Sequence, residues 1–363
     1  MIAGLKDWTD RFLGRGEAAT TVPPFDGALK PNRILEDAPT LLDLQAPDDL
    51  ATDGKSVFAS DGNAVLRVDG SATSQIAAFD RPVTALACLP GGGLAVALDG
   101  KEVRLVGGAQ DGKSFRDVAG GLVSVNAISV AADGKLLLTE GSRNQPYEHW
   151  CHDLMELGRS GRLLELDPAN GAGREIARGL GFAYGTCQAQ DGVWVSETWR
   201  HRIRCYGPGG ARSVLDRLPA YPSRIAPASN GDFWLTAFTA RTQLVEFILR
   251  EPAYRKRMMA EIEPRFWVAP ALTSGNTFLE PMQGAHIKTM GILKPWAPPR
   301  SYGLVIRLSP EGLPRYSLHS RVDGKNHGVT AAVECGGDLY VLAKGPKRLL
   351  RLSIAQAERS LQA

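Results

Sequence analysis

The sequence predicts an all-β protein, a six-bladed β-propeller with short helical insertions in blades 3 and 5. Three observations support this fold class. Six glycine-containing turns recur along the chain, at Asp53, Gly91, Asp133, Asp191, Asn230 and Gly336. Short apolar segments flank each turn, and the basic spacing is about 40 residues, as expected for four strands per blade. Long amphipathic helical patterns, which an α/β protein would need, are nearly absent.

The turns separate antiparallel strands, because their DG, NG and GG pairs supply the positive φ angles that tight hairpins need. The expected inner strands contain DDLAT, VTALACL, NAISVAA, GTCQAQ, SRIAPA and VTAAVE. The strands that follow the turns, such as VFAS, LLLT, VWVS and LYVL, suit burial on both faces. The separations are 38, 42, 58, 39 and 106 residues. The third and fifth are long because insertions split those repeats, whose outer strands resume at 161–171 and 302–312.

These patterns divide the chain of 363 residues into three parts. Residues 1–44 are expected to hold an N-terminal helix and a closing segment. Residues 45–355 form the propeller, with 241–300 inserted in blade 5, and residues 356–363 form a C-terminal tail. Within residues 1–16, Leu5, Trp8 and Phe12 share one helical face. That helix either docks on the body of its own protein or contacts a partner or a membrane surface.

Composition excludes several classes of function. The net charge is only +3, and no basic stripe suggests nucleic-acid binding. The beginning of the chain lacks the apolar core of a signal peptide, and no apolar run reaches the length of a transmembrane segment. The five cysteines show no CxxC spacing, which favours free thiols in a reducing compartment. A cytoplasmic location is therefore expected, with a small molecule as the partner.

Residues 147–153, YEHWCHD, hold the densest group of potential metal ligands and acid/base side chains in the sequence. If they are helical, His149 and His152 share a face. Three interpretations stay open: a pocket wall with ordinary hydrogen-bonding histidines, an acid/base or substrate contact by either histidine, or a metal site. A zinc site would need a distant third ligand that the sequence does not nominate. Elsewhere, Trp199 in SETWRH is interpreted as core packing.

The segments SGRLLELDPANG, LGFAYGTCQAQDGVWVSETWRHRIRCY, LPAYPSRIAPASNGDFWLTAF and YGLVIRLSPEG together resemble the strictosidine-synthase-like family. That family is a branch of the six-bladed propellers that include gluconolactonases, paraoxonases and diisopropylfluorophosphatase. The similarity extends from about residue 45 to 353. It implies a ligand site at one mouth of the central channel, where the innermost strands begin, and a connection containing Trp150 that overhangs this mouth.

Six positions around this mouth follow from the repeat and from the resemblance. Counting seven residues back from the turns gives Asn126, Tyr184, Ser223 and Val329, and comparison with the family's first two inner strands adds Asp48 and Val83. In the calcium-dependent relatives a Glu, two Asn and an Asp stand around the ring. Here only Asp48 and Asn126 supply comparable oxygen ligands. A Ca²⁺ ion on these two residues is the cofactor hypothesis. Val83, Trp150, Tyr184, Ser223, Val329 and Thr330 are the expected substrate contacts.

Three functions are weighed on this basis. The first is hydrolysis of a lactone or ester, with water activated by His149, His152 or His327, or by the metal. The second is a small-molecule-binding or accessory propeller without chemistry, which the depleted ligand ring and the apolar residues 264–300 suggest. The third is amine–aldehyde condensation, as in strictosidine synthase. It is disfavoured because the position of the family's catalytic glutamate is Thr330, which is no acid or base near neutral pH.

Overall fold

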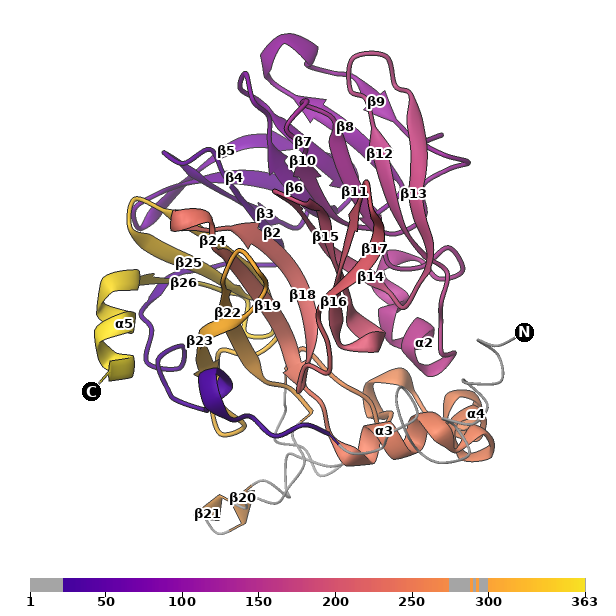
Figure 1. Ribbon diagram of the computed structural model, residues 1–363, viewed down its shortest axis with the longest axis vertical. Helices are drawn as coiled ribbons and strands as arrows, with labels where there is room; N and C mark the ends of the chain where they lie inside the picture. Colours follow the sequence, from indigo (N-terminus) through magenta and orange to yellow (C-terminus); the bar gives the residue numbers. More distant parts are fainter. Residues whose placement is uncertain (1–21, 274–287, 290–291, 294–299, 363) are drawn as a thin grey trace.

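Six four-stranded antiparallel sheets are arranged around one channel, which confirms the predicted six-bladed β-propeller (Figure 1). The computed structural model describes residues 22–273, 288–289, 292–293 and 300–362. The helix expected within residues 1–16 lies outside this part of the chain. In each sheet the strands follow one another from the channel outward, except that the outer strand of blade 6 comes from the beginning of the chain.

The blades are formed by consecutive strands whose bounds match the repeat. Blade 1 contains β2 (Pro47–Thr52), β3 (Val57–Asp61), β4 (Ala64–Asp69) and β5 (Ala72–Ala78). Blade 2 contains β6 (Val83–Cys88), β7 (Leu94–Leu98), β8 (Glu102–Val106) and β9 (Ser114–Phe115). Blade 3 contains β10 (Val125–Val130), β11 (Leu136–Glu140), β12 (Gly161–Leu166) and β13 (Gly173–Leu180).

The second half of the ring follows the same order. Blade 4 contains β14 (Ala183–Ala189), β15 (Gly192–Glu197), β16 (Arg202–Gly207) and β17 (Gly210–Leu215). Blade 5 contains β18 (Ala220–Pro227), β19 (Phe233–Ala240), β22 (Gly303–Leu308) and β23 (Pro314–Ser320). Blade 6 contains β24 (Val329–Cys335), β25 (Asp338–Ala343), β26 (Arg348–Ser353) and β1 (Thr40–Asp43).

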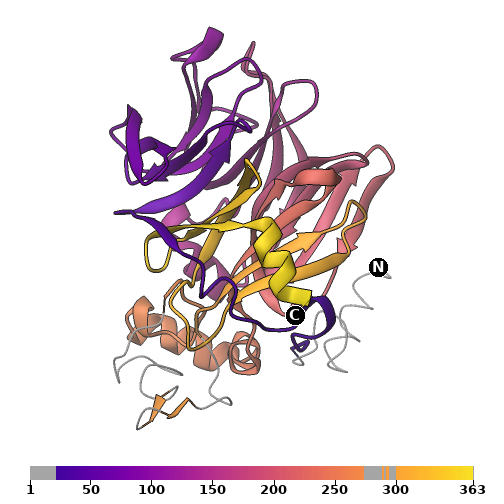
Figure 2. The ribbon, with the colours of Figure 1, turned by 90° about the vertical axis from the view of Figure 1, so that its left-hand side faces the viewer.

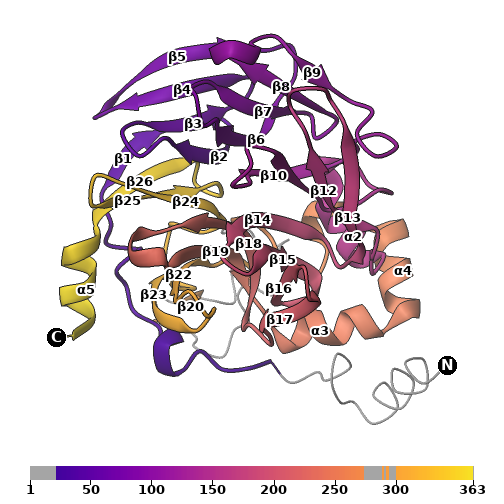
Figure 3. The same cartoon turned by 45° about the horizontal axis from the view of Figure 1, so that its top comes forward.

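The six inner strands share an irregularity near their first residues. In each, the pairing with the second strand shifts at the same place, and the residues in the shift are Asp48–Asp49, Thr84, Asn126, Tyr184–Gly185, Ser223–Arg224 and Thr330. A β-bulge bends its strand and changes the direction of a side chain. Each inner strand also contacts the inner strands of both neighbouring blades (Figure 3). The bulges therefore form a ring of residues around the channel, which we call the bulge ring.

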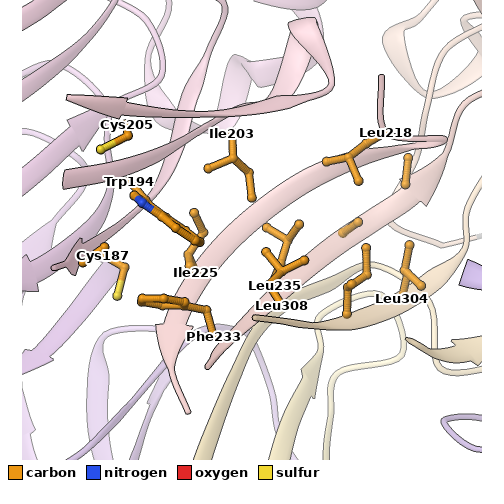
Figure 4. Packing of buried hydrophobic residues seen from close by; sticks show 14 of the residues in the cluster. Cys187, Trp194, Ile203, Cys205, Leu218, Ile225, Phe233, Leu235, Leu304 and Leu308 are labelled. Atoms are coloured by element: carbon orange, nitrogen blue, oxygen red, sulfur yellow. The ribbon is translucent and has the colours of Figure 1, made fainter. Parts of the chain in front are cut away.

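Apolar side chains fill the spaces between neighbouring blades. Between blades 4 and 5, Trp194, Ile203 and Cys205 pack against a set from the next blade (Figure 4), namely Ile225, Phe233, Leu235, Leu304 and Leu308. All of these side chains are buried. Because each sheet is covered on both faces by its neighbours, strands that follow the repeat turns, such as β7 and β11, are largely apolar and fully buried, as the sequence pattern indicates.

The two ends of the described chain meet at blade 6. Strand β1 pairs antiparallel with β26, so that an N-terminal strand completes the last blade. The predicted tail is instead a helix, α5 (Ile354–Gln362), which begins directly after β26. Its residues Ala357 and Leu361 pack with Ile34 and Leu35 (Figure 2). The sequence alone did not indicate this short helix, because its apolar residues find a partner only in the folded chain.

The insertions place helices at one mouth of the channel. The blade 3 insertion contains η4 (Tyr147–His149) and α2 (Trp150–Met155). The blade 5 insertion contains α3 (Gln243–Arg250), α4 (Pro252–Glu261), η7 (Pro264–Phe266) and a hairpin of β20 (Lys288–Thr289) and β21 (Ile292–Leu293). The short 3-10 turns elsewhere are η2 (Gly27–Leu29), η3 (Gly108–Gln110), η5 (Thr198–Arg200) and η6 (Ser229–Gly231). Buried residues of α2, α3 and α4 belong to one apolar cluster.

Within the described residues, no helix has the length and apolar character needed to cross a membrane. All five cysteines are free thiols, with Cys187 and Cys205 buried and the other three half-buried.

Candidate functional site

The centre of the bulge ring is occupied by the guanidinium group of Arg224, which comes from the inner strand of blade 5. It donates hydrogen bonds to the main-chain oxygens of Asp48 at 2.7 Å, Thr84 at 2.7 Å, Asn126 at 2.7 Å and Thr330 at 3.5 Å. These four residues belong to blades 1, 2, 3 and 6. The guanidinium carbon also lies 5.3 Å from the centre of the Tyr184 ring in blade 4. Arg224 thus contacts all five other blades.

Two carboxylates of blade 1 accompany this guanidinium. Asp48 Oδ1 lies 3.1 Å from Arg224 Nη2, and Asp49 Oδ1 lies 3.1 Å from Nε. Asp49 also accepts hydrogen bonds from the main-chain nitrogens of Leu50 and Leu86, both at 2.8 Å. Buried charges of this kind are tolerated only when they are paired and hydrogen-bonded. The ring therefore combines a fixed cation with two fixed anions.

Asp48 connects the ring to a chamber at the mouth of the channel. The Tyr147 hydroxyl donates to Asp48 Oδ1 at 2.5 Å, and Lys344 Nζ donates to Oδ2 at 2.5 Å. The Lys344 ammonium also lies 5.3 Å from the centre of the Tyr147 ring. Tyr147 is the first residue of the YEHWCHD heptapeptide, and Lys344 directly follows β25. Tyr147 of the blade 3 insertion and Lys344 of the loop after β25 thus meet at a carboxylate of the bulge ring.

The chamber has a volume of about 260 Å³, and its lining is mostly aromatic. Its walls and floor are formed by Asn126, Tyr147, Glu148, Trp150, Phe182, Tyr184, Trp199, Phe238, Leu272 and Lys344. The rings support one another: Trp150 meets Phe238 edge-on at 5.4 Å between centroids, and Phe182 lies 4.5 Å from Trp199. Aromatic walls with a few polar groups at one end are typical of small-molecule sites.

Burial and charge set the protonation of these groups. Burial opposes ionisation of Asp48, but the charges of Lys344 and Arg224 outweigh it and hold the pKa of this carboxyl below its usual value. For Asp49, burial is the larger effect and raises its pKa to about 6, against the attraction of Arg224. Burial, together with the negative charge of Asp48, raises the pKa of Tyr147 well above its usual value. At neutral pH the floor of the chamber therefore presents the protonated phenol of Tyr147, whose hydrogen-bond partner Asp48 is ionised.

A second cavity, of about 270 Å³, lies on the other side of Arg224. It is lined by Asp49 and Arg224 and by residues that come later along the same six inner strands, such as Ile128, Gln188 and Val333. The residues that line the aromatic chamber come from the bulge ring, from the insertions, from β19 and from the connections that contain Phe182, Trp199 and Lys344. The guanidinium of Arg224 therefore separates the two cavities along the channel.

The structure brings several sequence-predicted residues together. Asp48, Asn126, Tyr184 and Thr330 all belong to the bulge ring. The Thr330 hydroxyl donates to the Asp48 main-chain oxygen at 2.9 Å, and Thr330 is fully buried. This arrangement gives Thr330 a structural hydrogen bond and no acid/base role. Trp150 lies in the chamber wall.

Four predicted substrate contacts do not line the chamber, and the structure corrects them: Thr330, whose buried hydroxyl donates to the Asp48 main-chain oxygen, and Val83, Val329 and Ser223. Val83 and Val329 each come one residue before a bulge, so their side chains pack in apolar clusters of the blades and do not line the chamber. Ser223 lies in the bulge, but its hydroxyl interacts with Thr236 at 2.8 Å and donates to the Val329 main-chain oxygen at 3.0 Å. The side chain that reaches the channel from this bulge is Arg224.

The three candidate histidines do not line the chamber. His149 is exposed, and His152 lies between His149 and Trp267, 4.7 Å from each ring. His327 is buried, with Nδ1 2.7 Å from the Ser301 hydroxyl and Nε2 2.7 Å from the Arg321 main-chain oxygen. Burial lowers the pKa of both His152 and His327. The geometry therefore offers none of them as the base at the chamber floor.

Several residues of the site were not predicted. Arg224 directly follows the predicted Ser223, and a charge within the otherwise apolar inner strand SRIAP was a signal for it. Tyr147 lies within the heptapeptide, where the histidines and acids drew attention away from the aromatic residue. Trp199 was interpreted as core packing, but it lines the chamber together with Phe182 and Phe238. Lys344 follows a strand end in the sequence LAKG, and no sequence pattern marks it.

The donor set of the bulge ring does not fit a calcium ion. The Asp48 carboxylate is already paired with Lys344 and Arg224, and the guanidinium occupies the space between the ring oxygens. Asn126 Nδ2 donates to the Ala183 main-chain oxygen at 2.9 Å, while its buried Oδ1 has no hydrogen-bond partner. A Ca²⁺ ion needs six to eight converging oxygens, and two resident cations oppose it. Among the described residues, no group of three or more His, Cys, Asp or Glu side chains is placed to hold a metal ion.

The fold and the chamber together define a six-bladed β-propeller with a small-molecule-type cavity at one mouth of its channel. The structure resembles a gluconolactonase from Xanthomonas campestris, with a TM-score of 0.56, 14% identity and coverage of 88% of this chain and 90% of that one. It also resembles regucalcin, a calcium-binding protein from Agrobacterium tumefaciens, with a TM-score of 0.50, 12% identity and coverage of 92% and 95%. Such low identities support the fold alone.

The sequence relatives confirm the predicted resemblance more closely. Protein strictosidine synthase-like 6 of Arabidopsis thaliana is 30% identical over 167 residues, which cover 45% of this chain and 43% of that protein. The adipocyte plasma membrane-associated protein of Mus musculus is 28% identical over 242 residues, or 63% of this chain and 52% of that protein. The matches thus span about half the length of these relatives. No family model matches the chain. The protein is a propeller homologous to the strictosidine-synthase-like proteins.

Proposed function

We propose that the aromatic chamber binds a small, mostly apolar molecule that carries an oxygen acceptor, such as a carboxylate or a carbonyl group, at one end. The observation that carries this proposal is the floor of the chamber. There, the Lys344 ammonium lies beside the Tyr147 ring and donates to Asp48, below walls made of Trp150, Trp199 and Phe238.

The division of roles follows from the chemistry of the lining. Aromatic rings provide apolar contact area and stacking for the body of the ligand. An ammonium group has three protons, and Lys344 uses one of them on Asp48, which leaves donors for a ligand oxygen. The chamber volume of about 260 Å³ lies near the lower end of ligand pockets, about 300–1,000 Å³. The ligand should therefore be a compact molecule.

A binding experiment with defined probes tests this proposal. We expect 2-naphthoate to bind saturably and to quench the fluorescence of Trp150 and Trp199, and we expect 2-naphthol to bind more weakly because it lacks the anionic group. Lys344→Met should weaken naphthoate binding about 10-fold to 100-fold, since a hydrogen bond to a charged group contributes about 1.5–3 kcal/mol. Isothermal titration gives the same constants independently of fluorescence.

Lys347→Met is the matched control, because Lys347 is an exposed residue of the same loop and does not line the chamber. Its affinity for naphthoate should equal that of the unchanged protein. If Lys344→Met binds the probe as tightly as Lys347→Met does, or if no probe of this class binds saturably, the proposal is wrong.

Hydrolysis of a lactone or ester is the second candidate, and one specific feature favours it. Lys344 keeps unused ammonium protons beside the Asp48 carboxylate, where they are suited to polarise a carbonyl oxygen, while the Tyr147 hydroxyl holds that carboxylate in place. In such a reaction a water molecule adds to the carbonyl carbon and loses a proton to Asp48. The acyl C–O bond then breaks, and the alcohol leaves with that proton. Solved propellers named gluconolactonase and luciferin-regenerating enzyme share the fold.

A panel of aryl esters and lactones separates the two candidates. If the chamber is catalytic, Lys344→Met and Tyr147→Phe should each lower kcat/KM by about 10²-fold or more. His149→Ala and His152→Ala should leave it unchanged, because neither histidine lines the chamber. Saturable naphthoate binding without turnover of any ester or lactone would support the binding function alone.

A further inference from the structure

Arg224 differs from the other buried arginines in the origin of its partners. Arg162 pairs with Glu140 and with main-chain oxygens of Ala119 and Gly121, which lie in or next to its own blade. Arg307 pairs with Asp232 at 2.9 Å and donates to the Ser229 main-chain oxygen at 2.9 Å, both in blade 5. Its contact with Glu334 of blade 6 is longer, at 3.5 Å. The contacts of Arg224 instead extend across the channel to every other blade.

The partners of Arg224 are also those expected around a metal ion. They are main-chain oxygens and carboxylates that converge from separate strands onto one point of the channel axis. Hard oxygen donors in this arrangement repel one another unless a cation lies between them. In this chain the cation is a side chain of blade 5, so its presence in the ring does not depend on the ions in solution.

We propose that Arg224 is the resident cation of this propeller: its guanidinium takes the place in the channel where calcium-dependent propellers hold a metal ion, and it binds the six blades to one another. The protein consequently needs no metal for its folded state. This inference does not depend on what the aromatic chamber binds, because none of the contacts that carry it involves a chamber ligand.

The first test uses the unchanged protein. We expect its thermal midpoint to be the same in EDTA and in millimolar Ca²⁺, because the covalently attached guanidinium occupies the space between the ring oxygens and, with Lys344, opposes a further cation. A midpoint that falls in EDTA and rises with Ca²⁺ in a saturable way would overturn the proposal, since any ligand of the folded state alone raises stability by mass action.

The second test removes the guanidinium and returns it. Arg224→Ala should lower the midpoint strongly, because it leaves the buried Asp49 carboxylate and four main-chain oxygens without their cation and leaves Asp48 paired with Lys344 alone. N-Ethylguanidinium is the fragment that this substitution deletes. It should raise the midpoint of the variant by about 2 °C or more in a saturable way and should not raise that of the unchanged protein. An Arg224→Ala variant as stable as the unchanged protein, or one that folds and shows no rescue, contradicts the proposal.

Arg307→Ala is the matched control, since Arg307 is equally buried and has a carboxylate, a main-chain oxygen and an aromatic ring as partners. It should lower the midpoint less than Arg224→Ala does, and equal losses would show that Arg224 has no special place. If Arg224→Ala does not fold, Arg224→Lys gives the decision. Lysine keeps the charge but cannot reach four oxygens, so a lowered midpoint is expected and an unchanged one would refute the role of the guanidinium.

Discussion

Asp153 shows how the fold uses a single buried acid near the chamber. Its side chain is 1% exposed, and the Trp199 indole donates to Oδ1 at 3.3 Å. Burial raises the pKa of Asp153 to about 6 and outweighs the hydrogen bonds from Trp199 and Ser142, which act in the opposite direction. Trp199 belongs to the chamber wall and Asp153 belongs to α2. The protonation of this carboxyl therefore influences how firmly α2 is attached to the wall.

The stability contributed by Asp153 should depend on pH. The unfolded carboxyl has an ordinary pKa of about 3.8, below the folded value of about 6, so the folded state holds its proton more tightly. The contribution is complete below the unfolded pKa and is lost as the pH rises through about 6. Lowering the pH from 7.5 to 5 should therefore raise the free energy of unfolding by about 1 kcal/mol through this group alone.

Urea unfolding of Asp153→Asn against the unchanged protein measures this effect. The difference in free energy of unfolding between the two proteins should change by about 1 kcal/mol between pH 7.5 and pH 5, with acid favouring the unchanged protein. A difference for Asp153→Asn that is equal at both pH values would show that burial does not raise this pKa.

Individual site residues could be predicted only where their own side chains carried the signal. Asp48 and Asn126 were found because oxygen-bearing side chains occur at expected positions of the repeat. The contacts of Arg224 are mostly with main-chain oxygens, which every residue possesses and which no sequence pattern reveals. The partnership of Tyr147 with Asp48 joins residues 99 positions apart, and only the closed ring brings them together.

At the scale of elements, the blade 5 insertion supports the chamber from outside. Val245 and Ile248 of α3, Met258 of α4 and Trp267 after η7 are buried in the cluster that contains the chamber aromatics Phe182 and Tyr184. Figure 1 shows α3 and α4 beside α2 at the same end of the propeller. Within the apolar segment 264–300, Trp267, Val268 and Leu272 pack in this cluster, and residues 274–287, 290–291 and 294–299 lie outside the described part of the chain.

The start of helix α3 depends on the N-cap residue Thr242, which directly precedes the helix. The Thr242 hydroxyl accepts a hydrogen bond from the Val245 main-chain nitrogen at 3.3 Å, and Thr242 is buried. Thr242→Ala should therefore lower the free energy of unfolding by about 1 kcal/mol, which is the usual cost of losing an N-cap side chain. Thr242→Ser keeps the hydroxyl and should lose less. If serine and alanine destabilise the protein equally in urea unfolding, the capping bond is not the cause.

The sequence predicted which segments form strands, but it predicted the position of the bulge ring along each inner strand only in part. Counting seven residues back from the turn reaches the bulge at Asn126 and at Tyr184. In blade 6 the same count ends at Val329, one residue short of Thr330. The reason is the hairpin: strands β10 and β11 are joined by five residues, 131–135, whereas β24 and β25 are joined by two, 336–337. Loop length varies without changing the blade, so a fixed count slips by one.

At the scale of the whole molecule, the ring is closed by a strand from the start of the described chain. Strand β1 forms the outer edge of blade 6, and the segment before it is attached to blade 5. Leu35 is fully buried, and Asn32 Nδ2 donates to the Ser317 main-chain oxygen at 2.7 Å. A propeller whose last blade is completed by its first strand covers the edge of β26 and links the last blade to the first, which prevents these two blades from separating.

Removal of this closing segment should destabilise the whole ring. A variant that begins at Gln45 lacks β1 and Leu35, so β26 becomes an exposed edge strand and an apolar cavity replaces a buried leucine. Loss of the leucine alone costs about 2–5 kcal/mol, and the unpaired edge favours association between chains. We therefore expect a lowered thermal midpoint together with larger species in size-exclusion chromatography. A variant that begins at Val22 keeps β1 and Leu35 and is the reference for this truncation. A Gln45 variant that remains monomeric with the midpoint of the Val22 variant would mean that the six sheets hold together without their closing strand. The contacts of Arg224 across the channel would then be the principal link between the first and last blades.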